Sequence, residues 1–365
     1  IQLLKILGAE WQLLWARLAL QNLIHIVNPW TWKDVDMTIS DTSFDGVKVR
    51  IYNPNERFND GAMIFVHGGG FVLFSIDSFE GPIREIVRRS RVLTISIEYR
   101  LAPEYAFPAG LHDCLIAVKY FLRHGYMEYG IDPSKVAIMG DSAGGNLVAA
   151  MTQKFRDSTE DLPPLKSQLL IYPLLQFIDF QTPSYQMYET SYKGAALLDP
   201  SSIARYMLIY LNLDPTLEEL VLLNSHVSED VLRLANDKLH HSCLPQQYIH
   251  SGYDAQWIMS RNLSTDVYEH DHYQLLQNSL VNPDISPLMH PDLFGLPEAY
   301  IATGEYDILR DEGYMYYRRL RESGVSVTYK HFDSGFHGMM NFHTEIEVAS
   351  ELIADISKFL RRTLS

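Results

Sequence analysis

Three short segments of the chain carry a serine, an acidic residue and a histidine that together suit nucleophilic catalysis. Residues 140–144 read Gly-Asp-Ser-Ala-Gly, follow an apolar run and open a stretch of small and apolar residues through Ala150. A nucleophilic serine on a sharp strand-to-helix turn needs small neighbours because its backbone is strained, and its oxygen lies at a helix N-terminus. The pattern predicts Ser142 as a nucleophile that forms a covalent intermediate. The alternative is an ordinary glycine-rich turn.

A serine nucleophile needs a base, and the base needs a carboxylate to orient it. When the serine sits on such a turn, the acid and then the histidine follow it along the chain. Asp307 follows one strand-like run, and His337 lies in the turn-rich segment 333–338 after another, so we predict these two residues as the partners. Asp311 and Glu312 are interpreted as helix-start residues, which the positive end of a helix favours, and Asp311 is the second candidate for the acid.

Residues 67–70, His-Gly-Gly-Gly, end another strand-like run. Glycines let backbone N–H groups point at a developing oxyanion because no Cβ is in the way. We predict an oxyanion hole framed by His67, with Gly68, Gly69 and Ala143 as amide donors. A phosphate-binding loop is the alternative, but that loop would place Lys-Ser or Lys-Thr after its glycines, and neither follows here.

From residue 47 onward, short apolar runs alternate with helical stretches, a rhythm typical of a mostly parallel sheet covered by helices. The predicted strands are 47–52, 63–66, 92–99, 136–139, 168–172, 298–303 and 325–331. The predicted helices are 109–124, 143–156, 311–322 and 345–361. The sequence therefore predicts an α/β fold in which residues 46–365 form one catalytic domain. Residues from about 176 to 290 break the rhythm, show helical pieces and offer no clear strand, so we interpret them as an insertion.

The N-terminal residues are strongly apolar. Positions 4, 7, 11, 14 and 18 carry Leu or Trp at spacings of three and four residues, which predicts an amphipathic helix. Lys5, Glu10 and Arg17 interrupt the run, so a bilayer-spanning helix is disfavoured. A packed helix is favoured over an interfacial one, and a peripheral membrane contact through residues 1–27 stays open. Because the chain opens on Ile1 rather than Met, we expect an upstream segment.

Composition narrows the classes of partner. Forty-five acidic against 30 basic residues give a formal charge of −15, and no basic cluster is visible, so a nucleic-acid partner is not expected.

Cys114 and Cys243 are far apart and outside any metal-binding spacing, which leaves only a single disulfide open. The pair at 240–241 and His-Asp-His at 270–272 lack the spacing of a metal site and are interpreted as solvated polar loops. We expect no metal and no organic cofactor. Asn262 begins a glycosylation sequon that matters only in a secretory chain.

These motifs together resemble the hormone-sensitive lipase family, and most closely its arylacetamide deacetylase and neutral cholesterol ester hydrolase branch. The matching segments are 67–70, 99–104, 140–146, 307–313 and 335–338. The resemblance implies an α/β-hydrolase fold, with Ser142 as nucleophile, His337 as base and Asp307 as its partner. It further implies that residues 1–45 and the insertion form a helical cap over the site.

The expected reaction is hydrolysis of carboxylic esters, with a small-molecule or lipid ester as substrate. Amide-selective deacetylation uses the same residues and stays open. A ligand-binding receptor on the same fold is the alternative from another class; the gibberellin receptors resemble this family but lack the catalytic histidine, which His337 supplies here. By resemblance we expect the lumenal side of the endoplasmic reticulum. The sequence leaves acyl length, head group and oligomeric state open.

Overall fold

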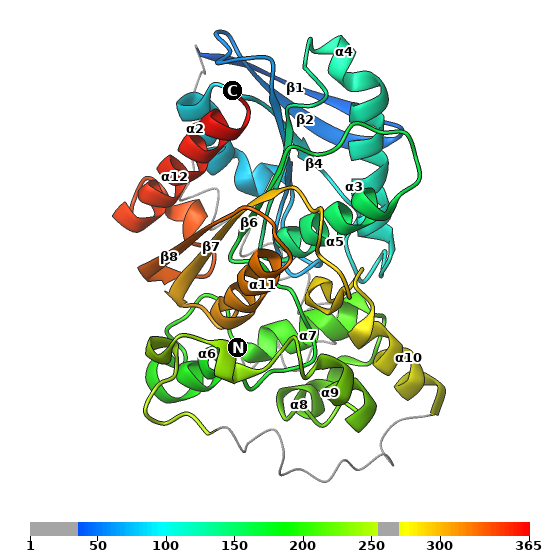
Figure 1. The fold of residues 1–365 in the computed structure, drawn as a ribbon, viewed down its shortest axis with the longest axis vertical. Helices are drawn as coiled ribbons and strands as arrows, with labels where there is room; N and C mark the ends of the chain where they lie inside the picture. Colours follow the sequence, from blue (N-terminus) through cyan, green and yellow to red (C-terminus); the bar gives the residue numbers. More distant parts are fainter. Residues whose placement is uncertain (1–35, 255–269) are drawn as a thin grey trace, which may run out of the picture.

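The computed structural model describes residues 36–254 and 270–365, and its centre is an eight-stranded sheet (Figure 1). The strand order is β1-β2-β4-β3-β5-β6-β7-β8. β2 runs antiparallel to both of its neighbours, and every pairing from β4 to β8 is parallel. The strands are β1 Met37–Phe44, β2 Val47–Pro54, β3 Ala62–Val66, β4 Leu93–Ile97, β5 Val136–Asp141, β6 Ser167–Ile171, β7 Glu298–Tyr306 and β8 Val327–Phe336. The predicted α/β-hydrolase fold is confirmed.

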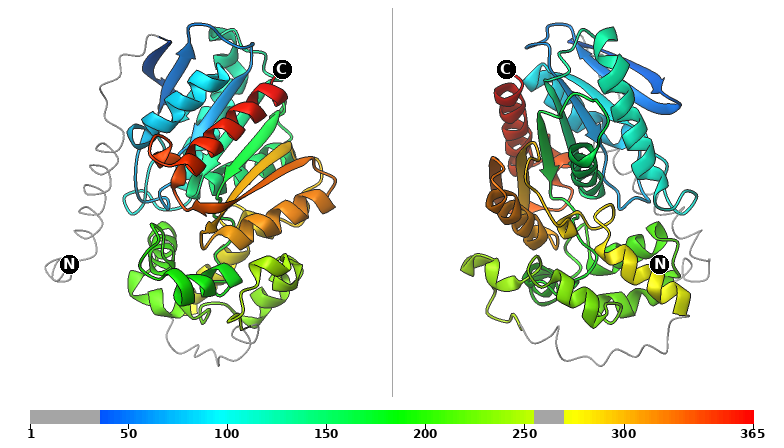
Figure 2. Two further views of the ribbon diagram at one scale, coloured as in Figure 1. Left: turned by 90° about the vertical axis from the view of Figure 1, so that its left-hand side faces the viewer. Right: turned by 45° about the vertical axis from the view of Figure 1, so that its right-hand side comes forward.

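Helices cover both faces of the sheet, which explains why the central strands read as unbroken apolar runs. One layer holds α2 Glu80–Ser90 and α12 Glu347–Thr363, and the other holds α3 Ala109–Tyr120, α5 Ala143–Asp157 and α11 Arg310–Glu322 (Figure 2). Alternate residues of β3 serve the two layers: Ile64 and Val66 join the core beneath α3 and α5, whereas Met63 and Phe65 join the core beneath α2 and α12. The strand period of two thus divides the apolar residues between two cores.

All seven predicted strands and all four predicted helices are present, with shifted ends. β1 and α2 were not predicted, and β1 makes the expected helical segment 1–45 wrong over residues 37–44. β1 is an edge strand with mostly exposed side chains, so it lacks an apolar run. Its pairing with β2 rests on a tight turn at Asp45 and Gly46, both with positive φ, which is the backbone that an Asp-Gly hairpin favours.

The insertion between β6 and β7 gathers at the end of the sheet where the parallel strands finish (Figures 1 and 2). Its described part contains no strand, as predicted, and consists of short helices. They are α6 Pro183–Met187, α7 Pro200–Tyr210, α8 Glu218–Leu222, α9 Glu229–Ala235 and α10 His270–Val281, and a further short helix, α4 Tyr126–Glu128, lies outside the insertion. Single turns of 3₁₀ or π type complete the chain: η1 Ile76–Phe79, η2 Phe121–Gly125, η3 Tyr188–Tyr192, η4 Pro215–Leu217, η5 His241–Cys243, η6 Gln246–Tyr248, η8 Pro287–Met289 and η9 Met339–Phe342.

Several predictions fall outside the described residues: the N-terminal amphipathic helix, the membrane contact of residues 1–27 and the sequon at Asn262. Among the helices within 36–254 and 270–365, none has the length and apolar character that crossing a bilayer requires. The predicted polar loop at 270–272 is wrong, because α10 begins at His270.

Candidate active site

The turn between β5 and α5 holds Ser142 in a conformation that few side chains adopt. Its φ is 53° and its ψ is −121°, and its backbone N–H donates to the Ile171 carbonyl at 2.9 Å. A Cβ on Gly140 would lie 2.8 Å from the Gly145 nitrogen, and a Cβ on Gly144 would lie 2.7 Å from the His67 carbonyl oxygen. The turn therefore requires glycine on both sides of the serine, which is the physical basis of the pentapeptide.

Neighbouring strands bring an acid and a base to this serine. Asp307 follows β7 and His337 follows β8, and the pairing of Tyr306 with Phe336 places both residues at the same edge of the sheet. His337 Nε2 lies 2.8 Å from Ser142 Oγ, and His337 Nδ1 lies 2.9 Å from Asp307 Oδ2. Asp307 is buried and also accepts from the Leu309 N–H at 2.9 Å. The three residues form one continuous hydrogen-bonded chain. Residues 333–336, expected as a turn, extend β8 instead.

Asp311 is in contact with neither Ser142 nor His337 and acts elsewhere. Both Asp311 and Glu312 lie in the first turn of α11 as predicted, but their side chains are buried. Asp311 accepts from the Ser184 N–H at 2.6 Å, and Glu312 accepts from the Leu175 N–H at 2.6 Å. Burial raises the pKa of Glu312 well above its usual value. The interpretation as helix-start residues is thus incomplete, because these carboxyl groups also form hydrogen bonds between α11 and the chain at and just before the insertion.

The loop after β3 carries the glycines predicted to bind an oxyanion. The structure places the Gly68 N–H 2.7 Å from Asp141 Oδ1, so this amide already has an acceptor inside the protein. Gly68, predicted as an oxyanion donor, therefore donates to Asp141 in this structure. Gly69 and Gly70 follow with φ of +116° and +60°, and the backbone N–H of neither has an acceptor among the residues that the structure describes. Ala143, at the first position of α5, is buried beside this loop.

His67 supports the loop through its backbone and ring. Its carbonyl oxygen accepts from the Tyr99 hydroxyl at 2.9 Å, and the two rings stack with centroids 4.4 Å apart. Burial lowers the pKa of His67, which favours the neutral ring. His67 thus supports the start of the loop, and its place in an oxyanion hole stays a prediction.

Asp141 is a functional candidate that the sequence analysis did not assign. Its side chain is buried between the nucleophile turn and the loop after β3, where a Cβ on Gly68 would lie 2.6 Å from its Oδ2. Burial raises the pKa of Asp141 to about 7, although the Gly68 N–H favours the charged form. Its place directly before Ser142 was the only available signal, and a buried acceptor cannot be distinguished from an exposed acid by residue type alone.

One of the two histidines expected in a solvated loop at 240–241 has little contact with solvent, since the His241 side chain is 8% exposed. His241 Nε2 lies 2.7 Å from Asp179 Oδ2, its Nδ1 contacts the Tyr253 hydroxyl, and the neighbouring carboxylate raises its pKa against the effect of burial. The prediction of a polar loop is therefore wrong for His241.

Within the described ranges, no three His, Cys, Asp or Glu side chains are grouped as a metal site would require. Cys114 and Cys243 are both free, so the disulfide that the sequence left open is not formed.

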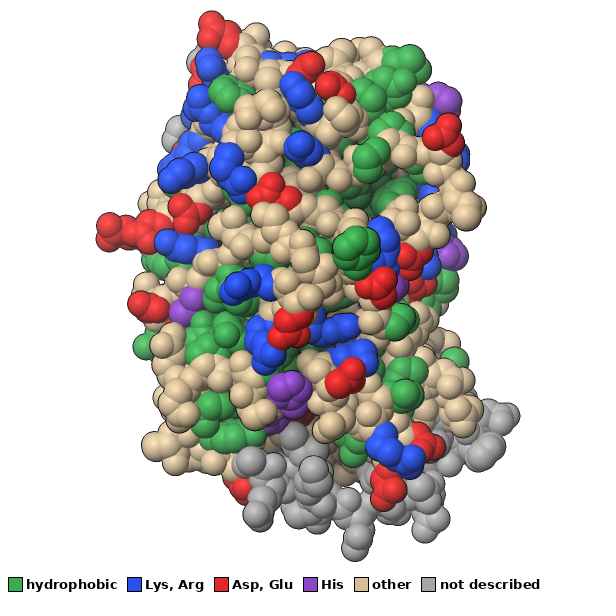
Figure 3. Space-filling model, viewed as in Figure 1, with side chains coloured by type: hydrophobic (Ala, Val, Ile, Leu, Met, Phe, Trp, Pro, Cys, Tyr) green, Lys and Arg blue, Asp and Glu red, His purple; other side chains and the backbone are tan. Residues whose placement is uncertain are grey.

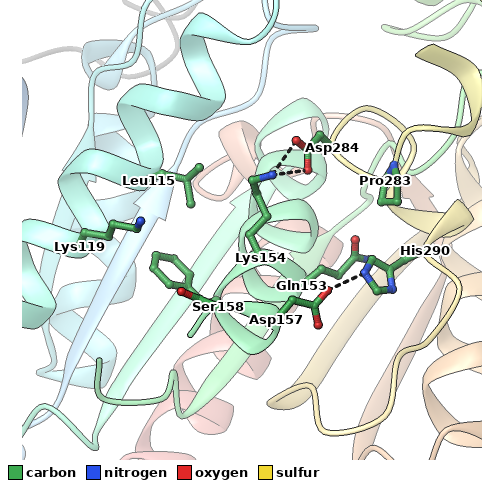
Figure 4. A pocket seen from close by; sticks show the side chains of 10 residues that line it. Leu115, Lys119, Gln153, Lys154, Asp157, Ser158, Pro283, Asp284 and His290 are labelled. Atoms are coloured by element: carbon green, nitrogen blue, oxygen red, sulfur yellow. Dashed lines mark hydrogen bonds and ion pairs between the residues drawn. The ribbon is translucent and has the colours of Figure 1, made fainter. Parts of the chain in front are cut away.

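A separate hollow of about 350 Å³ lies against α3 and the C-terminal half of α5 (Figure 4). Polar side chains around it have partners: Lys154 pairs with Asp284 at 2.7 Å, His290 lies 3.0 Å from Asp157, and Lys119 pairs with Glu160 outside the hollow. Figure 3 shows acidic and basic side chains interspersed across one face of the molecule. Neither feature concentrates charge of one sign for a ligand.

Known protein families and individual proteins match most of the chain in sequence. A family model described as alpha/beta hydrolase fold matches residues 63–236 and 252–341. Neutral cholesterol ester hydrolase 1 of Bos taurus is 36% identical over 320 residues, covering 85% of this chain and 76% of the relative. Arylacetamide deacetylase of Oryctolagus cuniculus is 35% identical over 317 residues, with the same coverage of both chains.

Solved structures agree with this family. The thermophilic carboxylesterase EstE1, cloned from a metagenomic library, superposes with a TM-score of 0.71 at 25% identity, covering 97% of this chain and 98% of that one. The hyperthermophilic esterase of Pyrobaculum calidifontis gives a TM-score of 0.67 at 25% identity, covering 97% and 92%. Both similar structures are those of esterases.

Proposed function

Since this chain belongs to the hormone-sensitive-lipase-like family of α/β-hydrolases and is a carboxylic-ester hydrolase, we propose that Ser142, His337 and Asp307 are its catalytic residues. The observation that carries the assignment is the continuous chain from Asp307 Oδ2 through His337 to Ser142 Oγ, with links of 2.9 and 2.8 Å. No other serine in the described residues stands in this relation to a histidine and a buried acid.

Each residue has a step in the proposed reaction. His337 Nε2 takes the hydroxyl proton as Ser142 Oγ attacks the ester carbonyl, and the proton then passes to the departing alcohol. A water that gives its proton to His337 next attacks the acyl-serine, which releases the acid and restores the serine hydroxyl. Asp307 holds the Nδ1–H of the ring and stabilises its positive charge in both steps.

The oxyanion of each tetrahedral intermediate needs preorganised donors. Because Gly68 donates to Asp141, we assign this role to the backbone N–H groups of Gly69, Gly70 and Ala143. The two positive φ values in the glycine loop and the helix N-terminus at Ala143 support the assignment. Asp141 supports it indirectly, since it holds the first glycine of the loop.

Membership in the family indicates small-molecule or lipid esters as the substrate class. The preference between esters and amides is our proposal. One similar protein is named for cholesterol ester hydrolysis and another for arylacetamide deacetylation. We propose that esters are preferred to amides, because two similar structures and one similar protein are named for ester cleavage, against one similar protein named for an acetamide.

A substrate panel tests this preference directly. Purified protein is assayed against acyl esters of increasing chain length beside an aryl acetamide, with Ser142→Ala as the blank. We expect kcat/KM for at least one ester to exceed that for the acetamide. A higher value for the acetamide would favour the amide-selective alternative. Tight ligand binding without any turnover would favour a receptor.

Location is a separate proposal, supported by the family resemblance of the motifs. We place the protein on the lumenal side of the endoplasmic reticulum, with a peripheral membrane contact through residues 1–27. Protease protection in intact microsomes tests the location, and co-sedimentation with phospholipid vesicles, with and without residues 1–27, tests the contact. Digestion in intact microsomes would overturn the location, and equal co-sedimentation of both forms would overturn the contact.

A further inference from the structure

The oxyanion loop packs against the insertion as well as against the nucleophile turn. At its first glycine the loop is tied to Asp141 through the Gly68 N–H. At its other end it meets α7, a helix of the insertion. A Cβ on Gly70 would lie 2.8 Å from Cγ of Tyr206, so the tyrosine ring rests directly on the Gly70 backbone. Two regions that are distant in sequence therefore meet at this loop.

The next residue of the loop is held by the same helix. Tyr210 lies one turn after Tyr206 on α7, and its ring stacks on Phe71 with centroids 3.9 Å apart and planes 9° from parallel. The Phe107 N–H donates to the Tyr210 carbonyl at 2.8 Å, and the Phe107 ring meets the Tyr210 ring edge-on. The stack is therefore buried inside further contacts.

The loop needs this support because of its backbone. Gly69, Gly70 and Phe71 have φ of +116°, +60° and +65°, and positive φ is costly for a residue with a Cβ such as Phe71. Such conformations persist only where the surroundings hold them. The Ala102 N–H donates to the Phe71 carbonyl, and the Phe177 ring lies 6.4 Å from the Phe71 ring between centroids. The two tyrosine rings of α7 cover Gly70 and Phe71 at closer range.

The helix is itself held in place. Asp199 caps its N-terminus by accepting from the Ser202 N–H at 2.9 Å, and Pro200 occupies the first position. Arg205 pairs with Glu218 of α8, on a side of the helix that contacts another part of the insertion. α7 can therefore act as a fixed support for the loop.

We propose that Tyr206 and Tyr210 are positioning residues that set the oxyanion donors, so that α7 contributes to transition-state stabilisation as well as covering the site. The proposal rests on the assignment of Gly69 and Gly70 as donors. Oxyanion donors act through preorganised geometry, and a loop displaced by a fraction of an ångström binds the charged intermediate less well while still admitting the substrate. Loss of the Tyr206 ring should therefore lower kcat and leave KM nearly unchanged.

The first test compares Tyr206→Ala with Tyr206→Phe on a short, soluble ester. Phe keeps the ring that touches Gly70 and Ala removes it. We expect Tyr206→Ala to lower kcat roughly 10- to 100-fold with KM within about 3-fold, and Tyr206→Phe to stay within about 2-fold of the parent. Ser191→Ala, at an exposed serine of the insertion outside α7, is the control and should leave both constants unchanged.

The second readout is affinity for a trifluoromethyl ketone, which forms a tetrahedral adduct whose oxyanion occupies the hole. The dissociation constant of the ketone should rise in Tyr206→Ala by about the factor by which kcat falls. A folded Tyr206→Ala protein with unchanged kcat, or with a change in KM alone, would overturn the proposal. So would a fall in kcat with unchanged ketone affinity.

A double-mutant cycle keeps the proposal testable if Tyr206→Ala is poorly folded. Gly70→Ala pushes a methyl group into the ring, so it should cost more activity beside Tyr206 than in the Tyr206→Ser background, which lacks Cγ and the ring. Equal costs in both backgrounds would show that the ring does not control the loop. Failure of these tests leaves the catalytic role of Ser142 untouched, because that role is measured by Ser142→Ala in the otherwise unaltered enzyme.

Discussion

At the carboxyl edge of the sheet, each side chain that meets at Ser142 lies at the end of a parallel strand, whereas the polar side chains of the insertion meet partners that no strand order brings together. Asp307 and His337 reach the serine because β7 and β8 are adjacent and parallel. In the insertion, Asp179 meets His241 across 62 residues, and Ser184 meets Asp311 across 127. The first kind of site is built by strand order, and the second by long-range burial.

The two regions differ in what one substitution should change. At the sheet edge the catalytic groups are held by backbone geometry, so removing a side chain should change chemistry more than stability. In the insertion, buried polar groups are partners in the packing, so removing one leaves an unpaired donor or acceptor and should change stability first. Glu312 illustrates the second case, since it holds both the Leu175 N–H and the Gln176 amide.

Ser142→Ala should give the largest effect. The substitution removes the atom that forms the acyl intermediate, so we expect kcat to fall by about 10⁴-fold or more while the melting temperature stays close to that of the parent. Ser191→Ala, at an exposed serine of the insertion, is the control and should leave both unchanged. Near-normal turnover in folded Ser142→Ala would remove the proposed mechanism.

Asp307→Asn compared with Asp311→Asn separates the two regions next. Asp307→Asn should lower kcat by about 10⁴-fold, because the ring of His337 loses its orienting anion. Asp311→Asn should mainly lower the melting temperature, because the carboxylate pairs with Arg310 and the Ser184 N–H inside the protein. Kinetics and thermal melts on both variants provide the measurement. A greater loss of kcat in Asp311→Asn would reverse the assignment of the acid.

Asp141 sharpens the comparison, because it is a buried carboxyl group at the sheet edge. Asp141→Ala removes the acceptor of the Gly68 N–H and should lower kcat roughly 10- to 100-fold through the loop. Asp141→Asn keeps an oxygen acceptor and should cost no more than about 5-fold. Steady-state kinetics at pH 8 test both variants. If Asn costs as much as Ala, the charge of Asp141 matters rather than its hydrogen bond.

The sequence predicted most of the sheet, and it predicted the serine, histidine and acid that we propose as catalytic, because strand ends and tight turns leave local patterns. Strands buried on both faces read as apolar runs, and the backbone around Ser142 excludes every side chain at Gly140 and Gly144. β1 was missed because an exposed edge strand has no such run. The role of Asp141 and the pairing of His241 with Asp179 were missed because the burial of the two carboxyl groups depends on residues distant in the chain.

The smallest expected effect is a pH dependence confined to the insertion. His226 is fully buried, its Nε2 lies 2.9 Å from the Phe177 carbonyl, and burial lowers its pKa to about 4. In the unfolded chain a histidine titrates near 6.5, so between these values the unfolded state binds a proton that the folded state does not. Stability is therefore intact above about pH 6.5 and falls as the pH drops toward 4, by about 1 kcal/mol at pH 5.5.

His226→Gln removes this titration and should be less stable than the parent at pH 8, because a packed ring is lost. From pH 8 to 5.5, however, the parent should lose about 1 kcal/mol more unfolding free energy than the variant does. Urea unfolding at the two pH values gives the loss of unfolding free energy in each protein. Subtracting one loss from the other removes the contribution of the titrating groups that the two proteins share. Parallel losses in the two proteins would mean that His226 is protonated in the folded state. The insertion would then have no acid-sensitive contact at this position.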